Sequence, residues 1–181
     1  MEYRSQRLVL RESSPGDLVA LRAYLLRNRA FLEAWEPLRD EAYYSEESLR
    51  TMLETEAAEA ARGAALRLYL RPPGEDRIIG TVGLTSVVRG AFLSCFLGYK
   101  LDEGEINKGY MTEALERTLE IAFSDMGLHR IEANVMPRNS RSIRVLEKLG
   151  FEREGLSPKY LRIAGKWEDH YHYVRRNGAL E

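Results

Sequence analysis

The stretch DEGEINKGYMTEALERTLEIAFSDMG, residues 102–127, decides the fold of this chain. Its first half is polar and contains two glycines. Its second half carries apolar residues at the spacing of one face of an amphipathic helix: Met111, Leu115, Leu119, Ala122 and Met126. Strand-like apolar runs lie on both sides, and Gly127 is placed to end the helix. The sequence therefore predicts a strand, a glycine-bearing turn, a long helix and another strand.

The glycine-bearing turn is a candidate anion site. A helix start leaves backbone N–H groups without partners, and the helix dipole adds partial positive charge. Lys108 stands beside Gly109 at this point, which favours binding of phosphate or pyrophosphate. The turn has neither a Walker pattern nor GxGxxG. An ordinary strand-to-helix connection, with Gly109 present only for its backbone freedom, is an equal alternative.

The composition is that of one globular domain spanning residues 1–181. A chain of 181 residues is long enough to bury about 70% of the surface that its unfolded state exposes. Its 44% hydrophobic and 30% charged residues exclude a disordered chain. The net charge of −1 and the pI near 6.4 give no overall attraction to nucleic acid or to an anionic membrane. We therefore expect no direct nucleic-acid binding.

Cysteine usage and the chain start bear on the compartment. Cys95 is the only cysteine, so an intrachain disulfide is excluded, which fits a reducing compartment. No cysteine and histidine cluster indicates a metal site. The first residues, MEYRSQRLVL, lack the apolar core of a signal peptide, and no apolar run reaches membrane length. We expect a cytoplasmic protein with no membrane partner.

Alternation and turn signals predict a mixed sheet of about seven strands with helices on both faces, an α+β class. The predicted strands are 7–11, 66–70, 78–88, 92–101, 129–135, 151–163 and 166–174. Ser14, Ser45 and Asn139 are the expected N-caps of the remaining helices. Ala164 and Gly165 are expected to close a final hairpin.

From the central strand onward, the sequence resembles the GNAT superfamily of acetyl-CoA-dependent N-acetyltransferases, and most closely its ribosomal-protein-alanine N-acetyltransferase branch. The stretches that carry the resemblance cover nearly the whole chain: NRAFLEAWEPLRDE (28–41), VVRGAFLSCFLGY (87–99), KGYMTEAL (108–115), HRIEANVMPRNSRSIRVLEKLGFEREG (129–155) and KYLRIAGKWEDH (159–170). The resemblance implies the GNAT fold with a mostly antiparallel sheet. It implies acetyl-CoA as the cofactor.

The resemblance also places the CoA pyrophosphate on the turn at 106–111, where the family pattern is R/Q-x-x-G-x-G/A. Gly109 matches this pattern, whereas Ile106 replaces Arg or Gln. Main-chain amides hold the pyrophosphate, so we expect Ile106 to weaken CoA binding without abolishing it. The cofactor-binding residues so implied are Tyr99, Leu101, Asn107, Lys108, Gly109, Tyr110, Met111, Thr112, Asn139 and Ser142. Asn139 would bind the pantetheine arm while capping its helix.

The candidate for the catalytic acid is inferred from a tyrosine that this chain does not have. Many GNAT enzymes have a tyrosine acid seven residues after this asparagine, and here that position is Leu146. Ser142, one helical turn on from Asn139 and facing the thioester in the family, inherits the thiolate-stabilising role by elimination. Tyr160 is its competitor for that role.

The acceptor site is expected in the irregular segment after the first helix, at Phe31, Trp35 and Glu36. Glu36 is also a candidate base, and the other candidate bases are Glu103, Glu105, Glu132, His129, His170 and His172. An α-amine has a pKa of ~7.7–8.0 and a lysine ~10.4, so its neutral form costs ~3.4 kcal/mol less. A site without an obvious strong base thus suits an N-terminal acceptor.

The resemblance implies a ribosomal protein with an N-terminal Ala as the acceptor and a monomeric or homodimeric enzyme. Two alternatives stay open. An acetyltransferase for a small amine, such as a polyamine or an aminoglycoside-like drug, would need clustered acids, which Glu33, Glu36, Asp40 and Glu41 offer. A CoA-binding, ribosome-associated protein with vestigial catalysis would explain Ile106 and the missing tyrosine.

Overall fold

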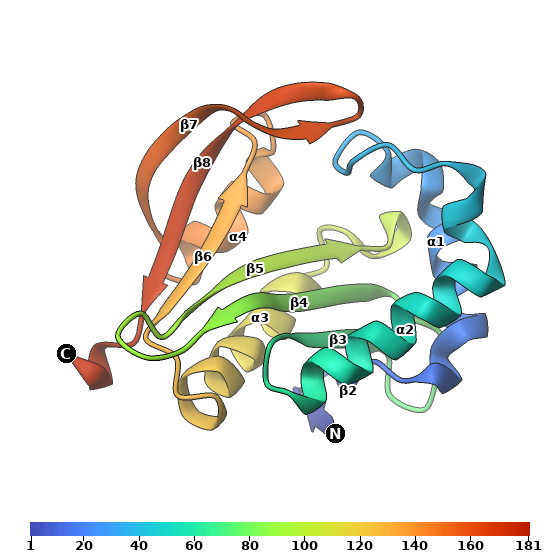
Figure 1. The fold of residues 1–181 in the computed structure, drawn as a ribbon, viewed down its shortest axis with the longest axis horizontal. Helices are drawn as coiled ribbons and strands as arrows, with labels where there is room; N and C mark the ends of the chain where they lie inside the picture. Colours follow the sequence, from blue (N-terminus) through green and yellow to red (C-terminus); the bar gives the residue numbers. More distant parts are fainter.

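A mixed sheet of eight strands runs through the computed structural model, which describes residues 1–181 (Figure 1). The strands are β1 (Glu2–Arg4), β2 (Val9–Glu12), β3 (Leu66–Arg71), β4 (Gly80–Val88), β5 (Ser94–Leu101), β6 (Arg130–Val135), β7 (Glu152–Ile163) and β8 (Lys166–Arg176). They lie in the order β1-β2-β3-β4-β5-β6-β8-β7, and only β5 and β6 are parallel neighbours. The mixed, mostly antiparallel sheet is confirmed, with eight strands in place of about seven.

The additional strand is β1, which pairs antiparallel with β2 through Tyr3 and Leu10. Its three residues are too few for an alternating pattern to be recognised. The turn after β1 is fixed from a distance, because the Ser5 hydroxyl and the Arg7 amide donate to Glu113 Oε1 at 2.7 and 2.6 Å. The seven predicted strands are all present, and their ends differ from the prediction by at most two residues.

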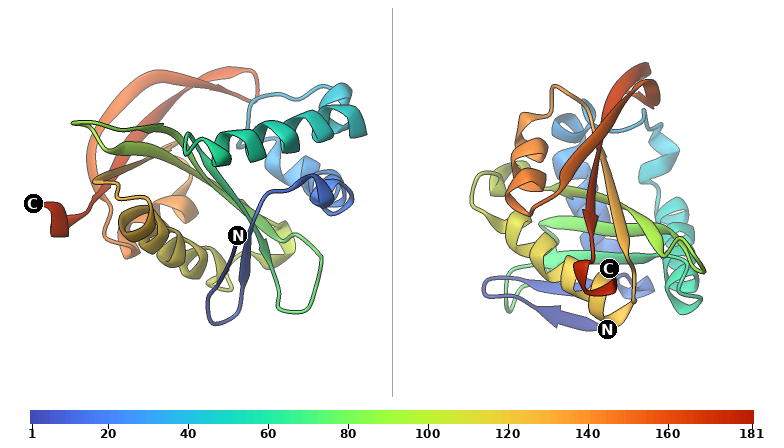
Figure 2. Two further views of the ribbon diagram at one scale, coloured as in Figure 1. Left: turned by 60° about the horizontal axis from the view of Figure 1, so that its bottom comes forward. Right: turned by 90° about the vertical axis from the view of Figure 1, so that its left-hand side faces the viewer.

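Four α-helices cover the sheet: α1 (Leu18–Leu32), α2 (Glu46–Ala61), α3 (Tyr110–Glu120) and α4 (Ser140–Lys148). Figures 1 and 2 show α3 and α4 on one face and α1 and α2 on the other. The predicted caps are present on two of them, since Ser45 Oγ and Asn139 Oδ1 each accept a backbone N–H at 3.2 Å. Ser14 precedes a short 3-10 turn, Pro15–Asp17, that leads into α1.

The predicted long helix is α3 and its continuation. Regular α-helix ends at Glu120, and a π-helical turn at Ile121–Asp125 follows, with the Met126 amide donating to Ile121 O at 2.9 Å. Gly127, with a φ of 62°, then ends the helix as predicted. The apolar stripe of α3 packs into the main core with the inner residues of β5 and β6. Cys95 lies in this core, where burial raises the pKa of its thiol to about 12.

A second, smaller core lies on the opposite face. Leu21, Tyr24 and Leu25 of α1 pack there with Leu49 and Leu53 of α2. This core ties both helices to the first half of the sheet. The face of β6, β8 and β7 opposite α4 therefore has no helix over it, as the right-hand view of Figure 2 shows.

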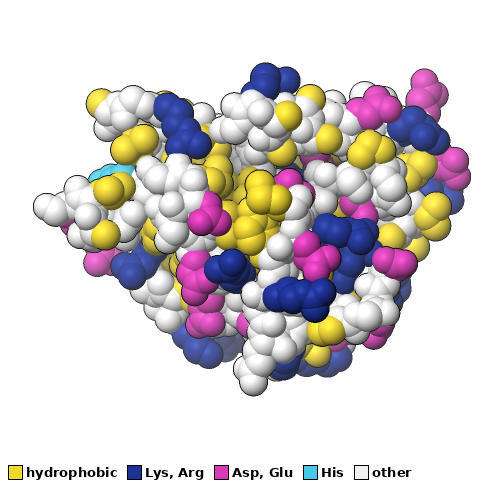
Figure 3. Space-filling view, turned by 90° about the horizontal axis from the view of Figure 1, so that it is seen from below, with side chains coloured by type: hydrophobic (Ala, Val, Ile, Leu, Met, Phe, Trp, Pro, Cys, Tyr) yellow, Lys and Arg dark blue, Asp and Glu magenta, His cyan; other side chains and the backbone are white.

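The surface mixes both signs of charge, with 27 Lys and Arg residues against 28 Asp and Glu residues in the chain. Figure 3 shows Lys and Arg side chains next to Asp and Glu side chains around a central hydrophobic group. None of the helices combines the length and the apolar character needed to cross a lipid bilayer.

Candidate active site

A cleft of about 320 Å³ opens where β5 and β6 separate. Their pairing ends at Phe96 and Glu132, although β5 continues to Leu101 and β6 to Val135. The end of β5, the turn before α3, the start of α3, one side of α4 and the end of α1 line this space. The cleft brings together every predicted cofactor residue except Lys108: Tyr99, Leu101, Asn107, Gly109, Tyr110, Met111, Thr112, Asn139 and Ser142. The predicted acceptor residues Phe31 and Trp35 line it as well.

The turn before α3 has the conformation that the anion-site prediction requires. Gly109 is the N-cap of α3 and has a φ of 82°, a left-handed conformation that favours glycine. The first helical bond runs from the Glu113 amide to Gly109 O at 3.1 Å. The amides of Tyr110, Met111 and Thr112 therefore have no acceptor within the helix. They are available to an anion at the positive end of the α3 dipole.

Arg7 is a residue of this site that sequence reasoning missed. Its Nε lies 2.7 Å from Glu113 Oε2, and its Nη1 donates to Lys108 O at 3.0 Å. Its guanidinium lies over the Tyr110 ring, 4.7 Å from the centroid. Arg7 thus adds positive charge beside Gly109, where Ile106 lacks it. Its separation of 106 residues from Glu113 leaves no local signal in the sequence.

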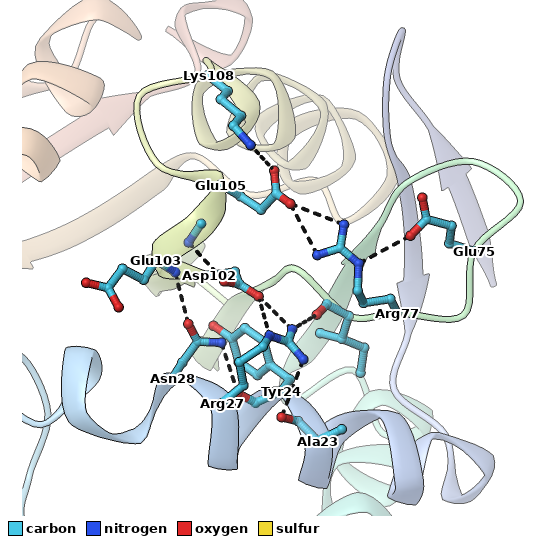
Figure 4. Close-up of polar contacts among 12 residues, drawn as sticks. Ala23, Tyr24, Arg27, Asn28, Glu75, Arg77, Asp102, Glu103, Glu105 and Lys108 are labelled. Atoms are coloured by element: carbon cyan, nitrogen blue, oxygen red, sulfur yellow. Dashed lines mark hydrogen bonds and ion pairs between the residues drawn. The ribbon is translucent and has the colours of Figure 1, made fainter.

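Lys108 is held by an acid instead of lining the cleft. Its Nζ lies 2.8 Å from Glu105 Oε2, while Arg77 donates to Glu105 Oε1 at 3.1 and 3.2 Å (Figure 4). The hydrogen bond from Lys108 is the main reason why the pKa of Glu105 falls, and Arg77 adds to the effect. Glu105 is therefore engaged with two cations, which leaves it poorly suited to act as the base.

Helix α1 is fastened to the same turn (Figure 4). Arg27 Nε and Nη2 donate to Asp102 Oδ2 at 2.8 and 2.6 Å. One residue on, Asn28 Oδ1 accepts the Glu103 amide at 2.9 Å. Both contacts come from the helix whose end carries Phe31 and leads to Trp35. The aromatic wall of the cleft and the anion site are thus held in one arrangement.

Two hydroxyl groups meet inside the cleft. Ser142 Oγ donates to Tyr99 Oη at 2.8 Å, and Tyr99 Oη donates to Ser142 O at 3.3 Å. Burial raises the pKa of Tyr99, so its phenol keeps its proton at neutral pH. Ser142 lies in the first turn of α4, where its amide is capped by Asn139. The pair places two hydroxyl groups in the cleft, and either could turn its single proton from its present acceptor to a bound group. The sequence predicted Tyr99 only as a cofactor contact.

The competitor of Ser142, Tyr160, lies elsewhere. It is on β7, with its ring 4.9 Å from the His172 ring and 5.8 Å from the His170 ring, and it does not line the cleft. Glu36 lies at the cleft's edge, where its Oε1 is 2.5 Å from Lys100 Nζ, a cleft-lining group. The geometry therefore favours Ser142 over Tyr160 for contact with a group bound in the cleft.

The acceptor side of the cleft joins three elements. Phe31 has the Arg141 guanidinium 5.7 Å from its ring centroid, and Trp35 has that of Arg138 at 4.9 Å. The tip of the β7–β8 hairpin reaches the same wall, because the Ala164 amide donates to Glu36 O at 2.9 Å. The predicted turn is present here, with positive φ at Ala164 and at the next residue.

The donor set fits a nucleotide pyrophosphate. The turn offers free amides, a glycine without a Cβ at the point of closest approach, and two nearby cations, Arg7 and Lys108. The remainder of the cleft is long and partly apolar, with Met111 and Val145 in its lining, as a pantetheine arm requires. Asn139 lies at its side; its Oδ1 accepts the Ser142 amide, and its Nδ2 has no partner in the protein.

Comparison with known proteins gives concordant matches. Residues 7–152 match the family model described as an acetyltransferase (GNAT) domain. The chain is 39% identical over 166 residues to the ribosomal protein uS5-alanine N-acetyltransferase of Escherichia coli, covering 92% of this chain and 86% of that protein. Two solved structures are similar over most of their length. One is the ribosomal-protein-S5-alanine acetyltransferase from Vibrio fischeri, with a TM-score of 0.95 and 33% identity over 100% of this chain and 99% of that one. The other is RimJ from Mycobacterium smegmatis in complex with CoA-disulfide, with a TM-score of 0.90 and 32% identity over 96% and 83%.

Proposed function

We propose that the acceptor of this enzyme is the α-amine of a protein N-terminus. The proposal proceeds from its family: the chain belongs to the GNAT family and is an N-acetyltransferase that uses acetyl-CoA. The acceptor that we propose in particular is a ribosomal protein that begins with Ala. The relatives named for that activity support this choice, as they match this chain over most of its length.

The observation that carries the proposal is the state of the acids near the aromatic wall. Glu36 is paired with Lys100 at 2.5 Å, and Glu41 with Arg29 at 2.5 Å. Asp40 caps a 3-10 turn. A small polycation would need several free acids at this place, and of the four predicted acids only Glu33 has no partner. A peptide end, with one amine and a small side chain, needs only one aromatic wall and one polar group.

The division of work follows from the geometry. Acetyl-CoA supplies the activated acetyl group as a thioester. The amides at the start of α3, with Arg7 and Lys108 nearby, would hold its pyrophosphate. Asn139 would orient the pantetheine arm. Ser142 and Tyr99 would donate to the sulfur as negative charge develops there, which lowers the barrier to its departure. Phe31 and Trp35 would confine the acceptor.

The test is acetylation of a designed peptide. It begins with Ala, contains one internal Lys, and is prepared with a free and with a blocked N-terminus; spermidine and an aminoglycoside serve as small-amine acceptors. After incubation with acetyl-CoA, mass spectrometry should find one acetyl group on the free α-amine and none on the blocked peptide. Equal turnover of spermidine, or acetylation of the Lys in the blocked peptide, would refute the proposed acceptor.

A further inference from the structure

Three side chains on the sheet face without helices form a hydrogen-bonded chain outside the cleft lining. Ser157 Oγ lies 2.7 Å from His172 Nε2, and His172 Nδ1 lies 2.9 Å from Glu132 Oε1. They come from β7, β8 and β6 in turn. The side chains of His172 and Glu132 are only 18% and 16% exposed. This serine, histidine and carboxylate order is the arrangement that moves a proton from a hydroxyl to an imidazole.

These three hydrogen-bonded side chains lie beside the point where β5 and β6 separate. Glu132 is the last residue of β6 that pairs with β5, opposite Phe96. Next along the same face of β6 is Asn134, which pairs with His172. Side chains alternate along β5, so Tyr99, a predicted cofactor residue, lies on the opposite face of the sheet from Phe96 and Gly98. The cofactor site and these three groups therefore lie on opposite faces of the sheet, beside the place where β5 and β6 separate.

Two glycines leave open space on the sheet face that carries His172. Gly155 of β7 lies directly opposite His172, and Gly98 of β5 is on the same face. A Cβ added to either glycine would meet nothing within 4 Å. Asn134 Oδ1 is buried there and has no hydrogen-bond partner. Buried acceptors are normally satisfied, so this one indicates a place for a donor such as an amine N–H.

Several charged and titratable groups face the hydrogen-bonded Ser157, His172 and Glu132. Arg130 donates to Glu132 Oε2 at 3.1 Å and also binds Glu154. Tyr160 places its ring against His172, and His170 follows on the same face of β8. Burial would raise the pKa of Glu132, but hydrogen bonds from His172 and Arg130 lower it overall. Glu132 is thus a carboxylate at neutral pH, and a carboxylate at Nδ1 keeps a proton there and leaves Nε2 free to accept one.

The surroundings of Ser157 argue against a nucleophilic role. A serine nucleophile needs N–H donors for the oxyanion, and the residue after the nucleophile commonly gives one. Here that residue is Pro158, which has no N–H. What remains is the capacity to accept and pass on a proton.

We propose that Ser157, His172 and Glu132 form the proton relay that deprotonates the acceptor amine. The acceptor enters as its α-ammonium, and one of its N–H protons passes to Ser157 Oγ as the hydroxyl proton moves to His172 Nε2, so Ser157 is unchanged and His172 becomes an imidazolium held by Glu132. The amine nitrogen is left with the lone pair that forms the new bond to the acetyl carbon. Asn134 Oδ1 accepts the second N–H of the amine and orients it. The inference rests on the proposed function for the identity of the amine.

The experiment compares pH profiles of kcat/KM for the Ala-starting peptide in the parent, His172→Gln, Glu132→Gln and Ser157→Ala. His129→Gln is the matched control. The structure removes His129 from the candidate bases, because it lies before β6, outside the cleft, with its Nε2 3.1 Å from Glu181 Oε1. At neutral pH each relay variant should lose roughly 10²-fold in kcat/KM, the usual scale for a general base, and the control should lose nothing. Above about pH 9 the α-amine is already neutral, so the loss should shrink by about tenfold.

A merely structural role would give a different pattern. It would lower the rate equally at every pH, or weaken CoA binding, and calorimetry of CoA should show unchanged affinity in all variants. A pH-independent loss, full activity in His172→Gln, or an acetyl group on Ser157 in the intact protein's mass would each overturn the relay. If the parent leaves the Ala peptide unmodified, the proposed acceptor fails, and the same variants are assayed with spermidine. There the relay predicts the same loss at neutral pH, which should shrink only above about pH 10, because an alkyl amine has a pKa near that of lysine. Equal rates in the parent and in the variants with spermidine would then overturn the relay itself.

Discussion

Replacing Gly109 by glutamate tests whether the turn before α3 holds the pyrophosphate. An L-residue in the left-handed conformation of Gly109 costs about 1–2 kcal/mol of folding free energy. The new Cβ would lie 3.3 Å from Arg7 Nη2, the end of a side chain that can adjust. A carboxylate roughly 5 Å from a phosphate charge adds a repulsion of roughly 1–3 kcal/mol for an effective dielectric constant between roughly 20 and 80. CoA affinity should therefore fall by about 5- to 150-fold from charge alone.

Gly109→Gln separates charge from bulk. Both variants carry the same backbone strain and nearly the same volume, so their melting temperatures should fall together. Titration calorimetry with CoA at low and at physiological salt gives the comparison. The affinity difference between the glutamate and glutamine variants should be largest at low salt, because salt screens the repulsion.

The reasoning fails if the two folded variants bind CoA equally at low salt. The carboxylate would then lie far from the phosphates, and the pyrophosphate site would have to be moved away from the start of α3. A parent-like affinity in both variants would remove the turn from the cofactor site altogether.

Three further predictions concern catalysis, the acceptor and pH. Ser142→Ala should lower kcat about 10- to 100-fold with little change in KM for acetyl-CoA, because the hydrogen bond from the Ser142 hydroxyl to the leaving sulfur strengthens as charge develops there. A parent-like kcat in steady-state assays would assign stabilisation of the thiolate to Tyr99. Glu36→Gln should raise KM or lower kcat for the Ala-starting peptide while calorimetry shows unchanged CoA binding, and an equal kcat/KM would place the acceptor site elsewhere. Burial raises the pKa of Glu113, but hydrogen bonds from Ser5 and Arg7 outweigh it, so the pKa is lower in the folded protein than in the unfolded chain. The Glu113 carboxylate therefore stabilises the fold above the unfolded pKa of about 4.3, and this stabilisation is lost as the pH falls through the folded pKa. Glu113→Gln should thus cost about 2 kcal/mol, or about 4–8 °C in Tm, at neutral pH and little near pH ~2; an equal Tm loss at both pH values in thermal unfolding would contradict this.

The parts of the fold that the sequence predicted are those with local causes. The stripe from Met111 to Met126 repeats at helical spacing, and Gly127 can take the positive φ that ends the helix. Asn139 follows a proline turn and has the side chain that caps an amide three residues on. These features depend on neighbours in the chain, and for that reason they could be read from it. The turn before α3 could be singled out for a related reason, since residues 106–112 form one continuous segment with Gly109 at the helix start.

The parts that the sequence could not predict depend on contacts between distant residues. Arg7 reaches the α3 turn across 101 residues, and Ser142 meets Tyr99 across 43. The bulge between Arg153 and Gly155 changes the register of β7, which decides the neighbours of His172. No local pattern encodes such distances. The π-helical turn after Glu120 is equally invisible, because its residues have the same apolar spacing as a regular helix.

The Glu105 carboxylate means that the cofactor turn carries its own counterion. Lys108 is already neutralised before a ligand arrives, and Arg77 keeps Glu105 in place when Lys108 turns to another anion. A polyanion that offers only charge must displace a tethered carboxylate whose effective concentration is high. A ligand that also accepts the free amides at the start of α3 gains more than it displaces. We therefore expect this turn to bind anions of the right shape and to discriminate against RNA phosphates, which offer only charge.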